Sequence, residues 1–210
     1  MEESVSRPRS RSNPNRSRIL NAAVVCFAAD PDASMDDVAR AAGVVRRTVY
    51  AHFPNRDALV EGLAEDAGAA LADAVDLAEP EAADIALAVG ILRTWPVGDR
   101  YRVLLSFARK EVGEERIGEL IAPMRTRTLD LVERGRGTGV FSSYLPAVVL
   151  VGMMEGLTMA TLEQANLGLV QDSGETVALG VLVLAGVDPE RAAHVVETAG
   201  QWLREYAGPA

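Results

Sequence analysis

The stretch that decides the fold is SMDDVARAAGVVRRTVYAHF, residues 34–53. Ser34 and Asp37 have the spacing of a capping box, which marks the start of a helix. Gly43 stands where a helix end needs a residue in the left-handed conformation. A second short helical segment, residues 45–53, ends before Pro54. Two short helices joined by a tight glycine turn predict a helix-turn-helix.

The second helix of this pair leaves polar side chains free once its valines pack inward, namely Arg46, Arg47, Thr48, Tyr50 and His52. Two adjacent arginines at the start of a short exposed helix suit guanine edges in a DNA major groove. The hydroxyls of Thr48 and Tyr50, and the amide end of the helix capped by Ser34, suit phosphates. An ordinary helical hairpin with a charged face fits the same spacing, so the pattern alone leaves both interpretations open.

The charge of the chain is divided unevenly along its 210 residues. The formal net charge of −9 argues against a nucleic-acid binder. Residues 1–60, however, carry 9 basic and 7 acidic side chains, whereas residues 61–210 carry 12 and 23. Residues 7–18 contain five arginines, among them Arg16, and no acid. We expect residues 1–13 to be a disordered arm, either a solvated tail or a segment that neutralises phosphates.

Several classes of function are disfavoured by composition. A single cysteine, Cys26, cannot form an internal disulfide framework, and two distant histidines do not suggest a metal site. We find no nucleophile elbow, P-loop or zinc-protease motif, so we expect no enzyme, no metal and no cofactor. The start of the chain lacks the apolar region of a secretory signal, and no apolar run is long enough for a membrane span. We therefore expect a cytoplasmic protein.

The rest of the chain shows helical periodicity and no strand pattern, which predicts an all-α protein. We expect the arm at 1–13, a three-helix DNA-binding domain at 14–57 and a helical effector-binding and dimerisation domain at 58–210. Pro96 is expected to end a helix that begins near residue 81, and residues 135–139 are expected to form a glycine loop.

Residues 35–59, MDDVARAAGVVRRTVYAHFPNRDAL, closely resemble the N-terminal motif of the TetR (tetracycline-repressor) family of bacterial transcription regulators. The shared elements are Val38-Ala39, Ala42-Gly43-Val44, Thr48-Val49-Tyr50, Phe53-Pro54 and the basic residue before Leu59. Ile19-Leu20-x-Ala22-Ala23 with Phe27 matches the first helix of that family. Val45 departs from the family, which often has a capping serine there.

The resemblance implies a homodimer that binds a palindromic operator in double-stranded DNA, most simply as a repressor that an unknown small molecule releases. Arg46, Arg47 and Thr48 would face the DNA. The backbone would be contacted or flanked by Tyr50, His52 and Arg56, and we add Ser34 and Arg16 to the candidate DNA contacts. A ligand would tilt the helix at 56–77 and so change the spacing of the recognition helices.

A ligand pocket is expected among the helices at 59–132, with candidates Trp95, Tyr101, Phe107, Arg109 and Met124. Two nearly apolar helices, at 146–166 and 173–185, are expected to form a two-fold interface. Its candidate residues are Val151, Met154, Leu157, Val181 and Leu184. A helical protein–protein interaction module without DNA binding is the alternative function.

Overall fold

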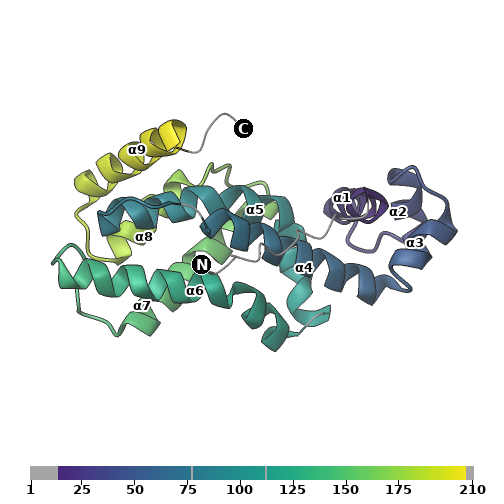
Figure 1. The fold of residues 1–210 in the computed structure, drawn as a ribbon, viewed down its shortest axis with the longest axis horizontal. Coiled ribbons are helices and arrows are strands. Elements are labelled where there is room, and N and C mark those ends of the chain that lie inside the picture. The colour runs from purple at the N-terminus through teal and green to yellow at the C-terminus, as the bar shows by residue number, and fades with distance from the viewer. Residues whose placement is uncertain (1–13, 77, 112, 207–210) are drawn as a thin grey trace, which may run out of the picture. The chain divides into compact units, whose positions relative to one another are not determined.

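The computed structural model describes residues 14–76, 78–111 and 113–206, without the side chains of 107–111 and 114. Within these residues all regular structure is helical, which confirms the predicted all-α class (Figure 1). The helices are α1 Pro14–Ala29, α2 Met35–Ala41, α3 Arg46–His52, α4 Arg56–Val75, α5 Ala83–Glu111, α6 Glu114–Gly137, α7 Ala147–Asn166, α8 Glu175–Leu184 and α9 Pro189–Tyr206. The arm predicted at 1–13 lies outside the described residues.

The chain divides into two compact units, an N-terminal unit that ends at Leu63 and a C-terminal unit that begins at Ala64. In the N-terminal unit, α1 packs on α2 and α3. Its core includes Phe27, Val38 and Val49, all nearly or fully buried. The boundary lies after Leu63 and not after residue 57, because Leu63 and the preceding apolar residues of α4 are buried and belong to the N-terminal unit.

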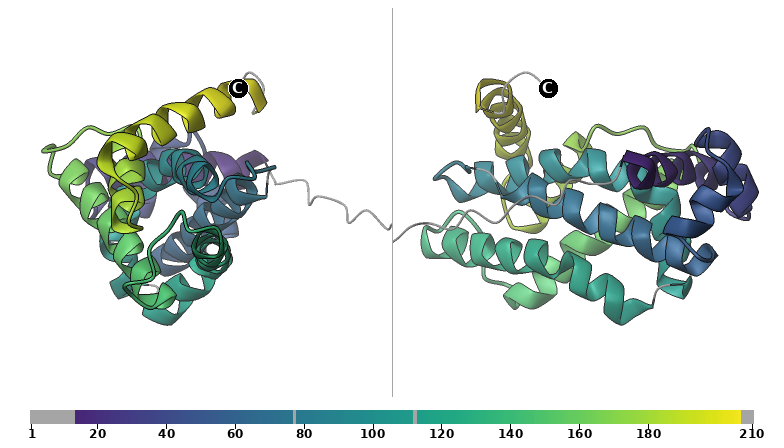
Figure 2. Two further views of the ribbon diagram at one scale, coloured as in Figure 1. Left: turned by 90° about the vertical axis from the view of Figure 1, so that its left-hand side faces the viewer. Right: turned by 45° about the vertical axis from the view of Figure 1, so that its right-hand side comes forward.

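The C-terminal unit is built around the long helix α5, which packs against α6, α7, α8 and α9 (Figure 2). Its core combines residues of all these helices, including Trp95, Val132, Leu150 and Leu182. The last two belong to the helices that are apolar on nearly every side. Burying large apolar side chains from several helices is the main stabilising contribution in such a bundle.

Helix α5 continues through Pro96, contrary to the expectation that this proline ends a helix. Proline removes one backbone hydrogen bond, a loss that packing elsewhere has to offset. Trp95, directly before Pro96, and Tyr101, more than one turn after it, are both buried. The indole N–H of Trp95 also donates to the carbonyl of Asp172 at 2.9 Å. These long-range contacts keep the chain helical where the local signal predicted an end.

Helix α6 likewise extends into the predicted glycine loop and ends at Gly137. The ring of Phe141 packs directly on Gly135, so that a Cβ at this position would lie 2.1 Å from the ring. Arg136 donates to the carbonyls of Ser142 and Leu145, at 3.2 and 2.6 Å. Gly135 is therefore required for close packing of a returning segment and not for a flexible loop.

Candidate nucleic-acid interface and ligand cavity

Local contacts fix both the start of α2 and the turn that joins α2 to α3. The Ser34 hydroxyl accepts from the Asp37 N–H at 3.2 Å, and the Asp37 carboxylate accepts from the Ser34 N–H at 3.0 Å, which confirms the predicted capping box. Gly43 has a φ of +63°, the left-handed conformation predicted for it. Arg18 of α1 donates to the carbonyl of Ala42 at 2.8 Å. The turn is thus fixed before any partner binds.

The capping box also changes the electrostatics at the start of α2. Hydrogen bonds from the Ser34 side chain and backbone, together with one from Arg40, lower the pKa of the Asp37 carboxyl. The carboxylate therefore stays ionised near the helix N-terminus, where negative charge is favourable. Both polar groups of Ser34 are engaged within this cap, so the predicted phosphate contact of Ser34 competes with a structural role.

Arg46 is held in a defined position on the exposed face of α3. Its guanidinium donates to the carboxylate of Asp36 at 3.0 Å and to the hydroxyl of Tyr50 at 3.3 Å. It also lies 5.2 Å from the centroid of the Tyr50 ring. The hydrogen bond with Tyr50, followed by the charge of Asp36, raises the pKa of Arg46. Arg46 is therefore a preorganised cation. One of its partners, Tyr50, lies one turn further along α3, and the other, Asp36, lies on α2.

Arg47 differs from its neighbour. It is exposed, and within the described part of the chain its side chain makes no hydrogen bond or ion pair. Thr48 and His52 are half-buried, and Val49 anchors the opposite face of α3 in the core. The exposed face of α3 thus combines one anchored arginine, Arg46, with one that has rotational freedom.

Val45 forms the N-cap of α3 without a side-chain hydrogen bond, as expected for a residue that replaces serine. Val45 is 69% exposed. The first turn of α3 contains no acidic residue. The N-terminal end of α3 therefore presents positive charge beside an apolar surface.

Two of the predicted DNA contacts are tied into the N-terminal unit itself. Arg56 donates to the carbonyls of Ala33 and Pro31, at 3.0 and 2.6 Å, and lies 4.4 Å from the centroid of the Phe27 ring. Arg16 lies over the ring of Phe53, at 5.4 Å from its centroid. Both arginines hold elements of the domain together, a role that their sequence positions alone do not reveal.

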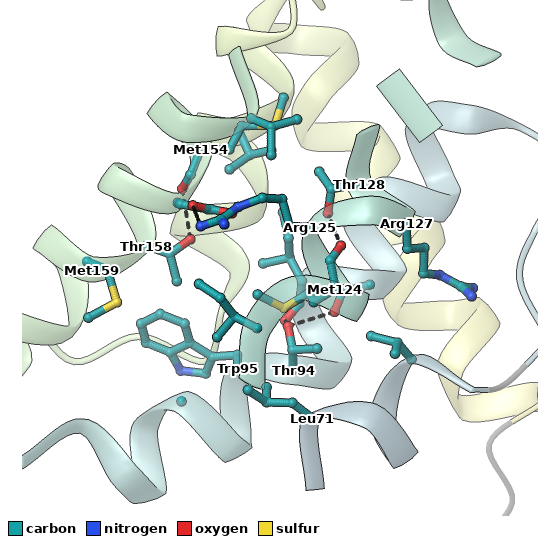
Figure 3. Close-up of a pocket in the computed structure, with 18 of the residues that line it drawn as sticks. Leu71, Thr94, Trp95, Met124, Arg125, Arg127, Thr128, Met154, Thr158 and Met159 are labelled. Atoms are coloured by element: carbon teal, nitrogen blue, oxygen red, sulfur yellow. Dashed lines mark hydrogen bonds and ion pairs between the residues drawn. The ribbon is translucent and has the colours of Figure 1, made fainter. Parts of the chain in front are cut away.

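The C-terminal unit contains a cavity of about 180 Å³, lined by residues of α4 to α8. Its walls are mostly apolar, with Leu71 from α4, Trp95 from α5, Met124 from α6 and Met154 and Met159 from α7 (Figure 3). A hydrophobic cavity with few polar groups is the usual form of a small-molecule site.

The polar groups of the cavity come from three helices. The guanidinium of Arg125 on α6 donates two hydrogen bonds to the carboxylate of Glu155 on α7, at 2.7 and 2.8 Å. These bonds raise the pKa of Arg125. The other polar groups are threonine hydroxyls, one each on α5, α6 and α7, from Thr94, Thr128 and Thr158. Arg127 also borders the cavity, but its side chain points away from it toward Glu79 (Figure 3).

Of the five residues predicted for the pocket, some line the cavity, one does not, and two have side chains that are not described. Trp95 and Met124 line the cavity. Tyr101 is buried but does not line the cavity, and its hydroxyl donates to the carboxylate of Asp66 at 2.6 Å. Burial and this hydrogen bond raise the pKa of Tyr101 well above its usual range. The side chains of Phe107 and Arg109 lie outside the described residues.

Three residues predicted for a dimer interface require correction. Val151, Met154 and Val181 are at most 4% exposed within a single chain, so they are not available to a second copy. Leu157 and Leu184 are half-buried. The exposed apolar residues of α7 and α8 lie on other faces of the same helices: Val148, Val149, Met153, Leu179 and Val183. Sequence did not distinguish the faces, because these helices are apolar nearly all round.

Neither a metal cluster nor a membrane segment is found in the described parts of the chain. No three His, Cys, Asp or Glu side chains there come close enough together to bind a metal ion. Each helix of residues 14–206, as far as it is described, is too short or too polar to span a membrane.

The geometry of the N-terminal unit agrees with what comparison by sequence finds. Residues 19–63 match the model of the bacterial regulatory proteins of the tetR family, which confirms the resemblance read from residues 35–59. No curated protein matches the chain in sequence.

Over most of its length the chain is similar in fold to solved structures of TetR-family transcriptional regulators. The fatty acid degradation regulator FadR from Bacillus halodurans is 18% identical and aligns over 84% of this chain and 97% of its own, with a TM-score of 0.70. LfrR from Mycobacterium smegmatis, in complex with proflavine, is 20% identical over 82% and 94%, with a TM-score of 0.64. FadR from Bacillus subtilis, in complex with stearoyl-CoA, is 19% identical over 80% and 97%, with a TM-score of 0.61.

Proposed function

We propose that this protein is a cytoplasmic transcriptional repressor that binds a palindromic DNA operator as a homodimer and is released by a small-molecule effector. The observation that carries the proposal is the exposed face of α3, where Arg46 and Arg47 stand side by side in a TetR-type helix-turn-helix. No catalytic reaction is part of the proposal.

Arg46 and Arg47 have different roles in the proposed recognition of DNA. Arg46 is preorganised by Asp36 and Tyr50, so it loses little conformational freedom when it meets a base edge. Arg47 is free to adapt to a guanine or to a phosphate. The arginines are flanked on α3 by Thr48, Tyr50 and His52. These three residues supply contacts to the sugar–phosphate backbone of the DNA.

The homodimer is supported by an apolar surface on α7 and α8. Val148, Val149 and Met153 are exposed on α7, together with Gly152 and Gly156, beside whose Cα atoms there is open space. Exposed apolar side chains gathered on one face are typical of an interface. Glycines on the same face allow a second backbone to approach closely. A two-fold dimer binds half-sites about one DNA turn apart or further.

Effector release is supported by the cavity and by the two roles of α4. The first turns of α4 supply Leu59 and Leu63 to the buried core of the N-terminal unit. Later turns of the same helix supply Leu71 and Val75 to the cavity wall. A ligand that binds one position of α4 better than another shifts the population of DNA-binding conformers. Two of the similar structures were solved in complex with proflavine or stearoyl-CoA, which supports the proposal of an organic effector.

The proposal is tested by selecting bound duplexes from a random DNA pool with the full-length protein. We expect enrichment of a motif with two inverted half-sites, since each protomer of a two-fold dimer presents one α3. Failure to enrich any duplex at low salt contradicts the proposal and favours a helical protein–protein interaction module.

A further inference from the structure

The cavity of the C-terminal unit has a size and a wall chemistry that restrict its ligand. Its volume is about 180 Å³, slightly above that of an engineered cavity of about 150 Å³ that binds benzene. The indole ring of Trp95 and the thioethers of Met124 and Met159 face this space (Figure 3). Aromatic rings and thioethers pack favourably against a ligand ring. The cavity therefore suits a compound of one or two rings.

Each of the three threonine hydroxyls of the cavity donates its proton to a backbone carbonyl of its own helix. Thr94 donates to the carbonyl of Gly90 at 2.9 Å, and Thr128 and Thr158 each donate to a carbonyl one turn back at 3.0 Å. Each hydroxyl oxygen therefore faces a ligand as an acceptor of hydrogen bonds. A ligand that carries only acceptors leaves these oxygens without partners.

The charged groups of the cavity neutralise one another. Arg125 and Glu155 form a two-bond pair, and Thr158 lies three positions after Glu155 on α7, so the two side chains are on the same side of the helix and both line the cavity. Glu155 uses only two of the N–H groups of Arg125. An anionic ligand that binds the remaining N–H groups is repelled by the Glu155 carboxylate, and a cationic ligand at Glu155 is repelled by Arg125. A neutral hydroxyl can instead accept from Arg125 and donate to Glu155 or Thr158 while the pair stays intact.

We propose that the cavity binds an uncharged, ring-containing alcohol or phenol whose hydroxyl lies between Thr158 and the Arg125–Glu155 pair. This inference deepens the proposed function, because such a compound would be the effector that releases DNA. It names a chemical class and does not depend on the identity of the regulated genes.

The test uses four probes of the same ring system in isothermal titration calorimetry with the full-length protein in the absence of DNA. They are 2-naphthol, 2-methoxynaphthalene, 2-naphthoate and 2-naphthylmethylammonium. We expect 2-naphthol to bind about 10-fold more tightly than each of the others, a difference of about 1.4 kcal/mol. Tighter binding of either charged probe, equal binding of the methoxy probe, or no binding of 2-naphthol up to its solubility limit overturns the proposal.

Variants of the polar groups sharpen the test. Glu155→Gln frees Arg125 and should reverse the order of 2-naphthol and 2-naphthoate, whereas Asp99→Asn should not, because Asp99 pairs with Arg102 outside the cavity wall. Thr158→Val should lower the affinity for 2-naphthol about 10-fold, while Thr158→Ser, which keeps the hydroxyl, should not. An unchanged probe order in Glu155→Gln contradicts the inference.

The binding assay contains no DNA, so it separates this inference from the proposed function. If 2-naphthol binds as expected but the random pool yields no duplex, the cavity inference stands and the proposed function fails. If a palindromic duplex is selected but the charged probes bind best, the inference on ligand class fails and the DNA-binding function stands.

Discussion

Gly90→Leu offers a quantitative prediction, because it fills the cavity from inside α5. Gly90 lines the cavity, and a Cβ at this position meets nothing within 4 Å. Replacing a helical glycine by a residue with a side chain gains about 1 kcal/mol of stability. Burying the remaining leucine carbons gains about 2 kcal/mol, and fixing their rotamers costs about 1 kcal/mol. The net gain is about 2 kcal/mol, which raises the Tm of a chain of this size by roughly 4–8 °C.

The same substitution removes the space for a ligand. We expect the affinity of Gly90→Leu for 2-naphthol to fall by about 100-fold or more, while its affinity for the selected operator stays within about 2-fold of the parent protein. Differential scanning calorimetry measures the Tm, titration calorimetry the ligand affinity and fluorescence anisotropy the operator affinity. Gly118→Leu is the matched control, since Gly118 is a helical glycine with open space that lies outside the cavity wall. The control should gain less stability and keep the ligand affinity. A lower Tm in Gly90→Leu, or retained ligand binding, refutes the assignment of this cavity.

Three further predictions concern the cap of α3, the apolar surface and a buried tyrosine. Val45→Ser should stabilise the N-terminal unit by about 1 kcal/mol, since Val45 has the extended backbone of an N-cap but no capping side chain, and chemical denaturation measures the gain. Met153→Glu should shift the dimer toward monomer in sedimentation equilibrium, whereas Leu169→Glu, at an exposed apolar residue outside α7 and α8, should not. The raised pKa of Tyr101 contributes stability that is complete below the unfolded value of about 10 and is lost as the pH rises through the folded value. Denaturant midpoints should therefore fall above pH 10 in the parent protein, and Tyr101→Phe should flatten that fall; an equally steep fall in the variant contradicts the role of the Tyr101–Asp66 hydrogen bond.

The helix-turn-helix could be predicted from sequence because its signals are local. Ser34 and Asp37 are three residues apart, Gly43 marks the turn, and the structure shows the capping box and the positive φ that these residues imply. The uneven distribution of charge along the chain also favoured DNA binding by the N-terminal residues. The acidic excess lies in residues 61–210, which leaves residues 1–60 with a small net positive charge.

The features that sequence did not reveal depend on residues far apart in the chain. The indole N–H of Trp95 donates a hydrogen bond to the carbonyl of Asp172, and this contact helps α5 to continue through Pro96. Arg125 and Glu155 are separated by 30 positions, and nothing in either local segment marks them as a pair. Periodicity also fails in α7 and α8, whose apolar residues surround the helix and so do not show which face meets the core.

The central claim, that α3 reads DNA, is tested most directly by the affinity of the full-length protein for the selected duplex as a function of salt. We expect the affinity of the parent protein to fall steeply with rising salt. Arg46→Ala and Arg47→Ala should each remove the preference for the selected duplex over a scrambled one. Arg204→Ala, which removes an exposed arginine of α9, should leave it unchanged. An undiminished preference in both α3 variants would contradict the account.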